Sequence, residues 1–563
     1  MRTTMRRLLI IALAFAAWHG SLNEAQACTN FIVGKKASAD GSVICSYNAD
    51  SYGAFMPLYH YPAAKHQPGD MRKIYEWDTN KYLGEIPEAA ETYNVVGNTN
   101  EWQVTIGETT FGGREEMVDS TGIIDYGSLI YIALQRSKTA REAIDVMTSL
   151  VEQYGYCSEG ETFTICDPNE AWIMEMMGCA ADRSISKERT VWVALRVPDD
   201  MICGHANQSR ITTFMPSKKQ KVKKGEETVL YSKNVVTYAR KMGWYSGKDE
   251  DFSYNAAYAK PDFSGRRICD ARVWQFFNRY ADGMEQYIPW AEGIKQDAEP
   301  MPLWVKPNRK LTVQDVQTAM RDHFEGTPFA LDNDMGGGIW DMPYRPTPLY
   351  FEVDGKQYFN ERPTSTQQTA WSFVSQMRSW LPREVGGCFW FGNDDGNMVA
   401  YTPVYCCATR APKAYAADGV DDITFSMDNA FWVENWVSNM VYPRYSLMFP
   451  TLQQVRDSLE HDYFSAQKEV EDRALTLEGQ ARVAYLTDYS CQKADQMLAR
   501  WKQLALHLIV KYNDMAVRPE SNGKFMRTPT GNGATVKRPG YSKRFARYLI
   551  EQTGTKLEKP VEK

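Results

Sequence analysis

The cysteine at position 28 follows Ala25-Gln26-Ala27, a tripeptide of the kind that signal peptidases cut. Cleavage after Ala27 would make Cys28 the first residue, with a thiol and an α-amine in one residue. The ordinary pKa is about 7.7–8.0 for the amine and about 8.5 for the thiol, so the neutral amine can accept the thiol proton near neutral pH. Such a residue would combine a nucleophile with its own base.

The segment before this cysteine has the parts of a secretory signal. Arg2, Arg6 and Arg7 form a positive region, and Leu8–Trp18 is an unbroken apolar stretch of 11 residues, too short to span a bilayer. We therefore expect residues 1–27 to be removed and the protein to be exported, to the periplasm or the extracellular space. The remaining chain would carry 61 basic and 69 acidic groups, a net charge of −8.

Two other interpretations of Cys28 stay open. In a lipoprotein the cysteine after the cut is diacylated, but such signals usually have Leu three positions before it, where this chain has Ala25. In the other interpretation Cys28 is a buried or disulfide-bonded residue that lies at the cut by coincidence. The nucleophile interpretation is favoured, because it gives a chemical use to both groups that cleavage would expose.

Few histidines are present to serve as a separate base. Six follow Cys28, and none forms HExxH or another close metal-binding pair. A Cys28–His205 dyad remains an alternative, although such a histidine is more often a structural hydrogen-bond partner. Two acidic loops, 332–334 and 393–397, lack the spacing of a calcium-binding loop and are interpreted as turns. We predict neither a metal site nor a cofactor.

A series of short motifs follows Cys28 in a fixed order. They are, along the chain, Cys28-Thr29, Val33–Ser38, Asp40–Ser42, Asn48 with Asp50, Gly97–Glu101, Lys138–Ile144, Tyr154–Tyr156, Asp167–Glu175, Ala206–Gln208, Ala271–Trp274, Phe324–Pro328, Arg362-Pro363 and Asn429–Trp432. This series, over residues 28 to 460, resembles the C69 dipeptidases. These are N-terminal-nucleophile (Ntn) hydrolases related to penicillin V acylase and bile salt hydrolase. Each motif alone is weak, whereas their order behind the cysteine is specific.

The resemblance implies a cysteine-type dipeptidase that acts on dipeptides or very short peptides without a cofactor. Cys28 would be the nucleophile, and Asp50 would hold its amine in register. Asn100 and Asn207 match positions that stabilise the oxyanion or orient the amine, and an oxyanion donor is worth about 3–4 kcal/mol. Arg272 would support the same network or pair with a substrate carboxylate, for which a guanidinium has the better geometry.

One position differs from the sequence pattern of that family. Close relatives commonly read R-N-x-D, where this chain has Tyr47-Asn48-Ala49-Asp50. Tyr47 thus replaces an arginine that lies beside the nucleophile in related acylases. Another arginine would have to supply that charge, and the candidates are Arg272 and its neighbours Arg266 and Arg267.

The composition argues against some other classes of protein. The 563 residues include 64 Lys and Arg against 70 Asp and Glu, a net charge of −6, which lacks the basic character of a nucleic-acid binder. No run of 18 apolar residues predicts a membrane span. A small peptide is the expected partner, and a homo-oligomer is compatible with the sequence. The alternatives are an amidase of N-acyl amino acids or bile-salt-like conjugates, and a lipid-anchored surface binding protein.

The elements that must position these residues are strands first and helices second. Residues 31–34 and 42–46 predict a hairpin with Asp-Gly at its turn, which returns Asp50 to the neighbourhood of Cys28. Residues 163–166 and 172–175 predict a second hairpin. Helices are predicted over 127–135 and 139–154, with Thr139 as a plausible N-cap. This order suits two stacked sheets between helical layers, an α+β fold that agrees with the four-layer αββα sandwich of Ntn hydrolases.

The C-terminal part of the sequence changes character. Apolar residues recur near a 3.6-residue spacing from 452 to 512, and the chain then becomes basic, with a solvated terminus. We expect three units: a signal peptide over 1–27, a C69-like catalytic domain over 28–451, and a C-terminal helical appendage with a basic tail over 452–563. Ten further cysteines are even in number and could form disulfides, but their pairing does not follow from sequence.

Overall fold

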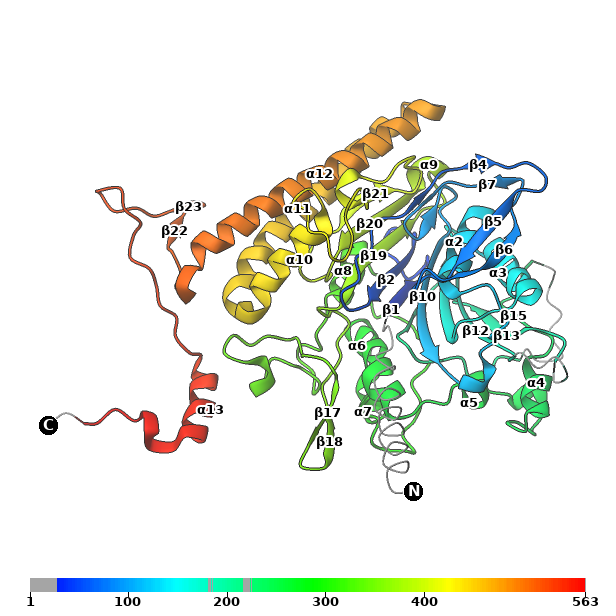
Figure 1. Ribbon diagram of the computed structural model, residues 1–563, viewed down its shortest axis with the longest axis horizontal. Helices are drawn as coiled ribbons and strands as arrows, with labels where there is room; N and C mark the ends of the chain where they lie inside the picture. Colours follow the sequence, from blue (N-terminus) through cyan, green and yellow to red (C-terminus); the bar gives the residue numbers. More distant parts are fainter. Residues whose placement is uncertain (1–27, 181–183, 185, 216–222, 224, 562–563) are drawn as a thin grey trace, which may run out of the picture.

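Two large antiparallel sheets stack face to face and carry helices on their outer faces, a mixed α+β architecture (Figure 1). The computed structural model describes residues 28–180, 184, 186–215, 223 and 225–561; the expected signal peptide lies outside them. Side chains of the two sheets meet directly, as in the 2.9 Å hydrogen bond between the hydroxyls of Thr105 and Ser375. None of the helices in the described part of the chain combines the length and apolar character needed to cross a bilayer.

The first sheet contains seven strands. In spatial order they are β16 (Trp304–Val305), β14 (Ile202–His205), β1 (Thr29–Val33), β2 (Val43–Asp50), β19 (Thr369–Met377), β20 (Gly387–Asn393) and β21 (Thr402–Tyr405). The second sheet contains eight. They are β15 (Val229–Tyr231), β13 (Thr190–Arg196), β12 (Ala171–Gly178), β11 (Gly160–Cys166), β10 (Thr105–Gly112), β9 (Thr99–Asn100), β8 (Val95–Val96) and β3 (His60–Tyr61).

Four two-stranded sheets complete the strands of the described residues. They pair β4 (Ala64–Lys65) with β7 (Glu91–Thr92), β5 (Met71–Tyr75) with β6 (Tyr82–Pro87), β17 (Tyr350–Val353) with β18 (Lys356–Phe359), and β22 (Glu520–Ser521) with β23 (Lys524–Phe525).

The hairpin predicted at the start of the chain is confirmed. β1 pairs antiparallel with β2 in a register that places Thr29 opposite Asn48. Residues of β1 alternate between two cores, since Phe31 and Val33 face helices while Ile32 packs with residues of the second sheet such as Ile173. Burial on both faces explains why the strand reads as a continuous apolar run.

The second hairpin and the two predicted helices are also confirmed. β11 pairs with β12 around the turn at 167–170, and α2 (Tyr126–Arg136) and α3 (Ala140–Tyr154) cover the outer face of that sheet. The side chain of Thr139 accepts a hydrogen bond from the backbone N–H of Glu142, which satisfies one of the unpaired amides at the start of α3.

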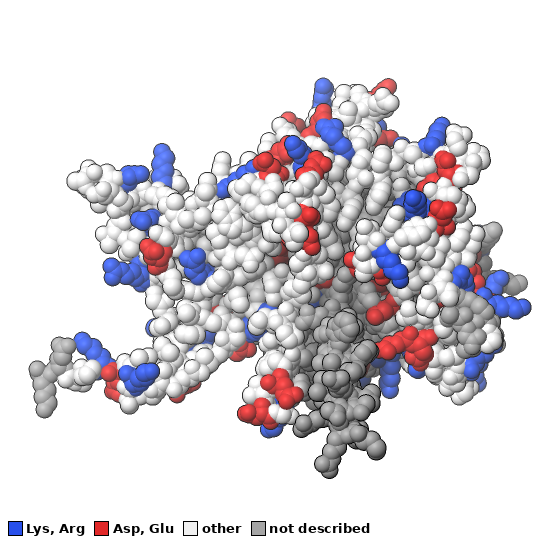
Figure 2. All heavy atoms as spheres, in the orientation of Figure 1, with Lys and Arg blue, Asp and Glu red and all other residues white. Residues whose placement is uncertain are grey.

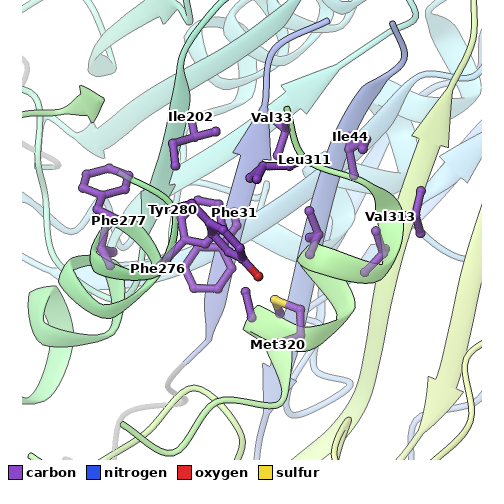
Figure 3. Packing of buried hydrophobic residues seen from close by; sticks show 14 of the residues in the cluster. Phe31, Val33, Ile44, Ile202, Phe276, Phe277, Tyr280, Leu311, Val313 and Met320 are labelled. Atoms are coloured by element: carbon purple, nitrogen blue, oxygen red, sulfur yellow. The ribbon is translucent and has the colours of Figure 1, made fainter. Parts of the chain in front are cut away.

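Helices α6 (Ala271–Tyr280) and α8 (Val313–Met320) pack on the outer face of the first sheet. Figure 3 shows Phe31 of β1 beside Phe276 of α6, and Ile44 of β2 on the side of Val313 of α8. The rings of Phe31 and Phe276 stack with centroids 4.1 Å apart. A π-helical turn over Gly265–Asp270 leads into α6. This packing fixes the start of α6 against β1.

The remaining helices of the described residues vary widely in length. They are α4 (Val235–Lys241), α5 (Tyr254–Tyr258), α7 (Ile288–Glu292), α9 (Arg383–Gly386), α10 (Ala430–Val441), α11 (Tyr445–Leu475), α12 (Gly479–Lys511) and α13 (Lys543–Thr553). The long helices α11 and α12 lie over the sheet formed by β19 to β21, and Trp501 and Leu504 share a core with Phe389 and Phe391. The division expected at residue 452 stays a prediction; α11 runs across that position.

A basic arm follows α12. Residues 516–561 hold ten Lys and Arg against three Glu, and Figure 2 shows the blue side chains gathered over this arm at the left of the molecule. The arm carries β22, β23 and α13 away from the two sheets and returns through an ion pair between Arg544 and Asp341.

A buried ion pair ties α11 to the first sheet. Arg378, directly after β19, donates to both carboxylate oxygens of Glu471 at 2.6 and 2.9 Å. Replacement Glu471→Ala would leave the guanidinium buried without its counter-charge, and we expect the free energy of unfolding to fall by about 3–5 kcal/mol. Denaturant unfolding measures this loss. Asp472→Ala, which removes the exposed neighbouring carboxylate, should cost under about 1 kcal/mol; equal losses for both variants would contradict the prediction.

Candidate active site

The thiol of Cys28, directly before β1, lies between the end of the β1–β2 hairpin and Glu108 of β10. Cys28 is 3% exposed, and its Sγ lies 3.4 Å from the Tyr47 hydroxyl and 3.6 Å from Oε1 of Glu108. The Tyr47 hydroxyl also donates to the same Glu108 oxygen. Asn30 donates to the Glu108 carbonyl at 2.6 Å and so fixes β10 against β1. The two sheets together build this part of the site.

The surroundings of the thiol favour its protonated form. Burial raises the pKa of Cys28 well above its usual value, and the nearby Glu108 and Asp50 carboxylates raise it further. The Tyr47 hydroxyl and the backbone of Asp50 act in the opposite direction, because their hydrogen bonds favour the thiolate. A thiol in this environment needs a base close to it before it can attack a carbonyl.

Asp50 ends β2 next to Cys28, as the hairpin predicted. Its carboxylate is buried, receives the Thr369 hydroxyl at 2.6 Å and pairs with Arg362 at 2.6 Å. Burial raises the pKa of Asp50 to about 6, although Arg362 and Thr369 both work to lower it. The carboxylate therefore changes its charge close to the physiological range.

Arg272, on the first turn of α6, holds the backbone of Cys28. Its Nη1 donates to the Cys28 carbonyl and the Thr29 hydroxyl, both at 2.7 Å. Its Nη2 donates to the Ala206 carbonyl and to Oδ1 of Asn207, both at 3.0 Å. The fully buried guanidinium thus bridges the first residues of β1 and the end of β14.

The hydrogen bonds of Arg272 decide between its two expected roles. Its Nε donates to the Ile268 carbonyl at 3.0 Å, so each of the five guanidinium N–H groups has a protein acceptor. This arrangement supports a positioning role. It disfavours the alternative that Arg272 pairs with a substrate carboxylate, because that pairing would break bonds already made in the buried site.

Asn207 joins the same network. It adopts a left-handed backbone conformation with φ of +60°, and its Nδ2 donates to the Thr110 carbonyl of β10 at 2.8 Å. A hollow of about 340 Å³ starts beside it, lined by Phe111 and Gln208 among others. Asn207 therefore connects Arg272 with β10, directly before a residue that lines the hollow.

The hydrogen bonds of Asn100 do not favour the oxyanion role that was expected for it. Its Nδ2 donates to the carbonyls of Leu134 and Ser137 at 2.7 and 2.8 Å, and its Oδ1 accepts from the amides of Trp102 and Val104. Both amide hydrogens are used to join the turn after β9 to the end of α2. The side chain has no donor left for an oxyanion and acts as a turn residue.

His205 is a structural hydrogen-bond partner. Its ring lies between the hydroxyls of Thr109 and Thr164, at 2.7 Å from each, and connects the two sheets. Burial lowers the pKa of His205 to about 3, with a further contribution from Arg210. Because both ring nitrogens are occupied by threonines, the structure does not support a Cys28–His205 dyad.

The other candidate arginines have partners other than Cys28. Arg266 stacks on Trp290, and Arg267 pairs with Glu361. Tyr47, which was expected to replace an arginine, places its hydroxyl 3.4 Å from Sγ.

Sequence reasoning missed Glu108 and its neighbour Glu161. Both are acidic residues inside strands whose other residues are apolar or small, and that contrast was the available signal. Within the described residues no group of three His, Cys, Asp or Glu is arranged to bind a metal. The cysteines, all of which the structure describes, form no disulfide bond.

A buried thiol, flanked by a hydroxyl and a carboxylate between two stacked sheets, is the kind of site that hydrolases use. Comparison with known proteins agrees with this class. A sequence model described as Peptidase family C69 matches residues 27–458, so the chain belongs to this peptidase family.

Named relatives match over most of their lengths. A probable dipeptidase of Salmonella dublin is 26% identical over 418 residues, which cover 70% of this chain and 84% of that protein. A probable dipeptidase of Latilactobacillus sakei is 24% identical, over 75% of this chain and 82% of that protein. A dipeptidase of Bifidobacterium longum is 23% identical, over 73% and 76%.

Proposed function

We propose that this chain is an exported cysteine-type dipeptidase in which Cys28 becomes the N-terminal nucleophile. The observation that carries the proposal is the placement of Cys28: its thiol lies within reach of Tyr47 and Glu108 while Arg272 fixes its carbonyl. The names of the relatives support dipeptides as substrates. Two stacked antiparallel sheets with helices outside are compatible with an Ntn-hydrolase αββα sandwich.

In the proposed reaction the α-amine of Cys28 takes the thiol proton, and Sγ attacks the carbonyl carbon of the substrate's peptide bond. The S–C bond forms, the C–N bond breaks, and the proton passes from the amine to the departing amino acid. A water molecule then adds to the thioester, the S–C bond breaks, and the thiol recovers a proton. Asn207, oriented by Arg272, is the proposed donor to the oxyanion, and Asp50 holds the Cys28 ammonium that forms between the steps.

Mass spectrometry of the purified protein's N-terminus tests the proposed processing. A first residue Cys28 with an unmodified amine, in material that hydrolyses dipeptides, is the expected result. An acyl-glyceryl mass on Cys28 would favour a lipid-anchored protein instead. Full dipeptidase activity in protein that keeps residues 1–27 would show that the amine of Cys28 is not the base.

The activity is expected to depend on the charge of Asp50. Its pKa of about 6 means that the carboxylate is ionised above this pH and protonated below it. Only the ionised form can hold the Cys28 ammonium, so kcat/KM should fall as the pH drops through about 6. A profile from about pH 4 to about pH 9 measures this. Protonation of the Cys28 amine gives a limb of its own at about pH 8 in every variant. Asp50→Asn should remove only the limb near pH 6, whereas Asp40→Asn, in the hairpin turn, should keep both; a limb near pH 6 that persists in Asp50→Asn would contradict the assignment.

A further inference from the structure

Two glutamates lie together beside the nucleophile and are not used in the proposed reaction. β10 and β11 pair so that Thr110 is opposite Glu161 and Glu108 is opposite Phe163. Glu108 and Glu161 are therefore diagonal neighbours on one face of the sheet. They are 2% and 0% exposed. The two buried carboxylates thus lie together, and Glu108 is the one that contacts the thiol of Cys28.

Each carboxylate has one oxygen to which no residue outside the pair donates. Oε1 of Glu108 accepts from Tyr47, and Oε2 of Glu161 accepts from the Thr110 hydroxyl at 3.0 Å. Their other oxygens, Oε2 of Glu108 and Oε1 of Glu161, are buried and receive no donor from a third residue. In the absence of substrate the two carboxyl groups can satisfy each other only by sharing a proton, and a ligand with N–H donors would replace that bond.

The pair also lacks a counter-charge. No described residue forms an ion pair with Glu108 or Glu161, and burial raises the pKa of both carboxyl groups. Glu108 raises the pKa of Glu161, and Asp78, which accepts the Tyr126 hydroxyl at 2.9 Å, raises the pKa of both. A cation placed between the two glutamates would relieve this repulsion.

The position of the pair relative to Sγ suggests where such a cation would come from. Oε1 of Glu108 is 3.6 Å from the sulfur. In a peptide, the α-nitrogen of a residue lies about 2.5 Å from its own carbonyl carbon, as the standard bond lengths and angle require. A substrate whose first carbonyl carbon approaches Sγ therefore brings its α-nitrogen into the neighbourhood of these carboxylates.

We infer that Glu108 and Glu161 form the binding site for the protonated α-amine of the substrate's first residue. The inference rests on the proposed dipeptidase function and specifies its substrate: a peptide with a free N-terminus, cut after its first residue. An ammonium offers three N–H donors and a positive charge, which would satisfy Oε2 of Glu108 and Oε1 of Glu161 together. An N-acyl substrate offers one N–H and no charge, so the site disfavours the acylase alternative.

Comparison of two substrates with Glu161→Gln tests the inference. Alanyl-alanine carries the ammonium, and propionyl-alanine has the same shape with a hydrogen in its place. The unsubstituted enzyme should prefer alanyl-alanine by at least about 100-fold in kcat/KM. Glu161→Gln should lower kcat/KM for alanyl-alanine by about 10- to 100-fold, mainly through KM, and change that for propionyl-alanine by less than about 3-fold. Glu159→Gln, an exposed neighbour, is the matched control and should leave both values unchanged.

Binding supplies a second measurement that does not depend on turnover. Calorimetry on Cys28→Ala should show that alanyl-alanine binds more tightly than propionyl-alanine, and that adding Glu161→Gln removes the difference. Equal losses for both ligands would mean that Glu161 is only structural, and an unchanged preference would mean that the two glutamates merely share a proton; either result overturns the inference. Failure of the proposed function is separate, because it would appear as alanyl-alanine hydrolysis that survives Cys28→Ala.

Discussion

Replacing Cys28 by Ala should lower kcat for dipeptide hydrolysis by at least about 10³-fold, because removal of a nucleophile leaves only the catalysis that binding and oxyanion stabilisation supply. The fold should survive the change. The backbone of Cys28 is held through its carbonyl by Arg272 and through the pairing of Thr29 with Asn48, neither of which involves the sulfur. Loss of activity with an unchanged Tm would thus assign the effect to chemistry.

The control for this variant is another thiol. Cys157 is partly exposed and lies after α3, so Cys157→Ala should retain activity within about 2-fold. Steady-state hydrolysis of alanyl-alanine, with the N-terminal processing of each variant checked by mass spectrometry, provides the comparison. Retention of more than about one hundredth of the activity in processed Cys28→Ala would contradict the nucleophile assignment.

Replacing Arg272 by Lys should lower kcat/KM by about 10²- to 10³-fold, the second largest effect that the structure predicts. An ammonium has three donors and cannot span the five acceptors that the guanidinium joins. The Cys28 carbonyl and Asn207 would then lose their common support. The loss should appear mainly in kcat, because the contacts of Arg272 are with the protein.

The neighbouring Arg267 is a suitable control, since its guanidinium pairs with Glu361. Arg267→Lys should retain kcat/KM within about 3-fold. If Arg272→Lys lowered Tm but left kcat unchanged for the folded fraction, Arg272 would be a stabilising residue without influence on the site. Unchanged activity together with unchanged Tm would contradict the positioning role.

Much of the fold could be predicted because its signals are local. The Asp-Gly turn and the flanking apolar runs are enough to specify the β1–β2 hairpin, and that hairpin places Asp50 beside Cys28. Thr139 marks the start of α3 by the hydrogen bond that its side chain can accept. These features depend on residues only a few positions apart.

The parts of the site that were missed depend on contacts between distant segments. Glu108, which was missed, reaches Cys28 across 80 residues of sequence. Arg272, which contacts Cys28 across 244 residues, was expected only because of the family resemblance. Nothing near Glu108 in the chain indicates that β10 will lie against β1. The motif position of Asn100 suggested an oxyanion donor, whereas its side-chain amide donates to the backbone carbonyls of Leu134 and Ser137, which lie 34 and 37 residues away in the sequence.

The attachment of Cys28 through its carbonyl has a consequence for maturation. Removal of residues 1–27, as proposed, would change the covalent state only on the amino side of this residue. Arg272 holds the opposite side, through a peptide group that cleavage leaves intact. Activation would then resemble that of a zymogen whose catalytic geometry exists before the cut. Cleavage before Cys28 would create a titratable amine on a residue whose carbonyl side is already held in place in the folded precursor.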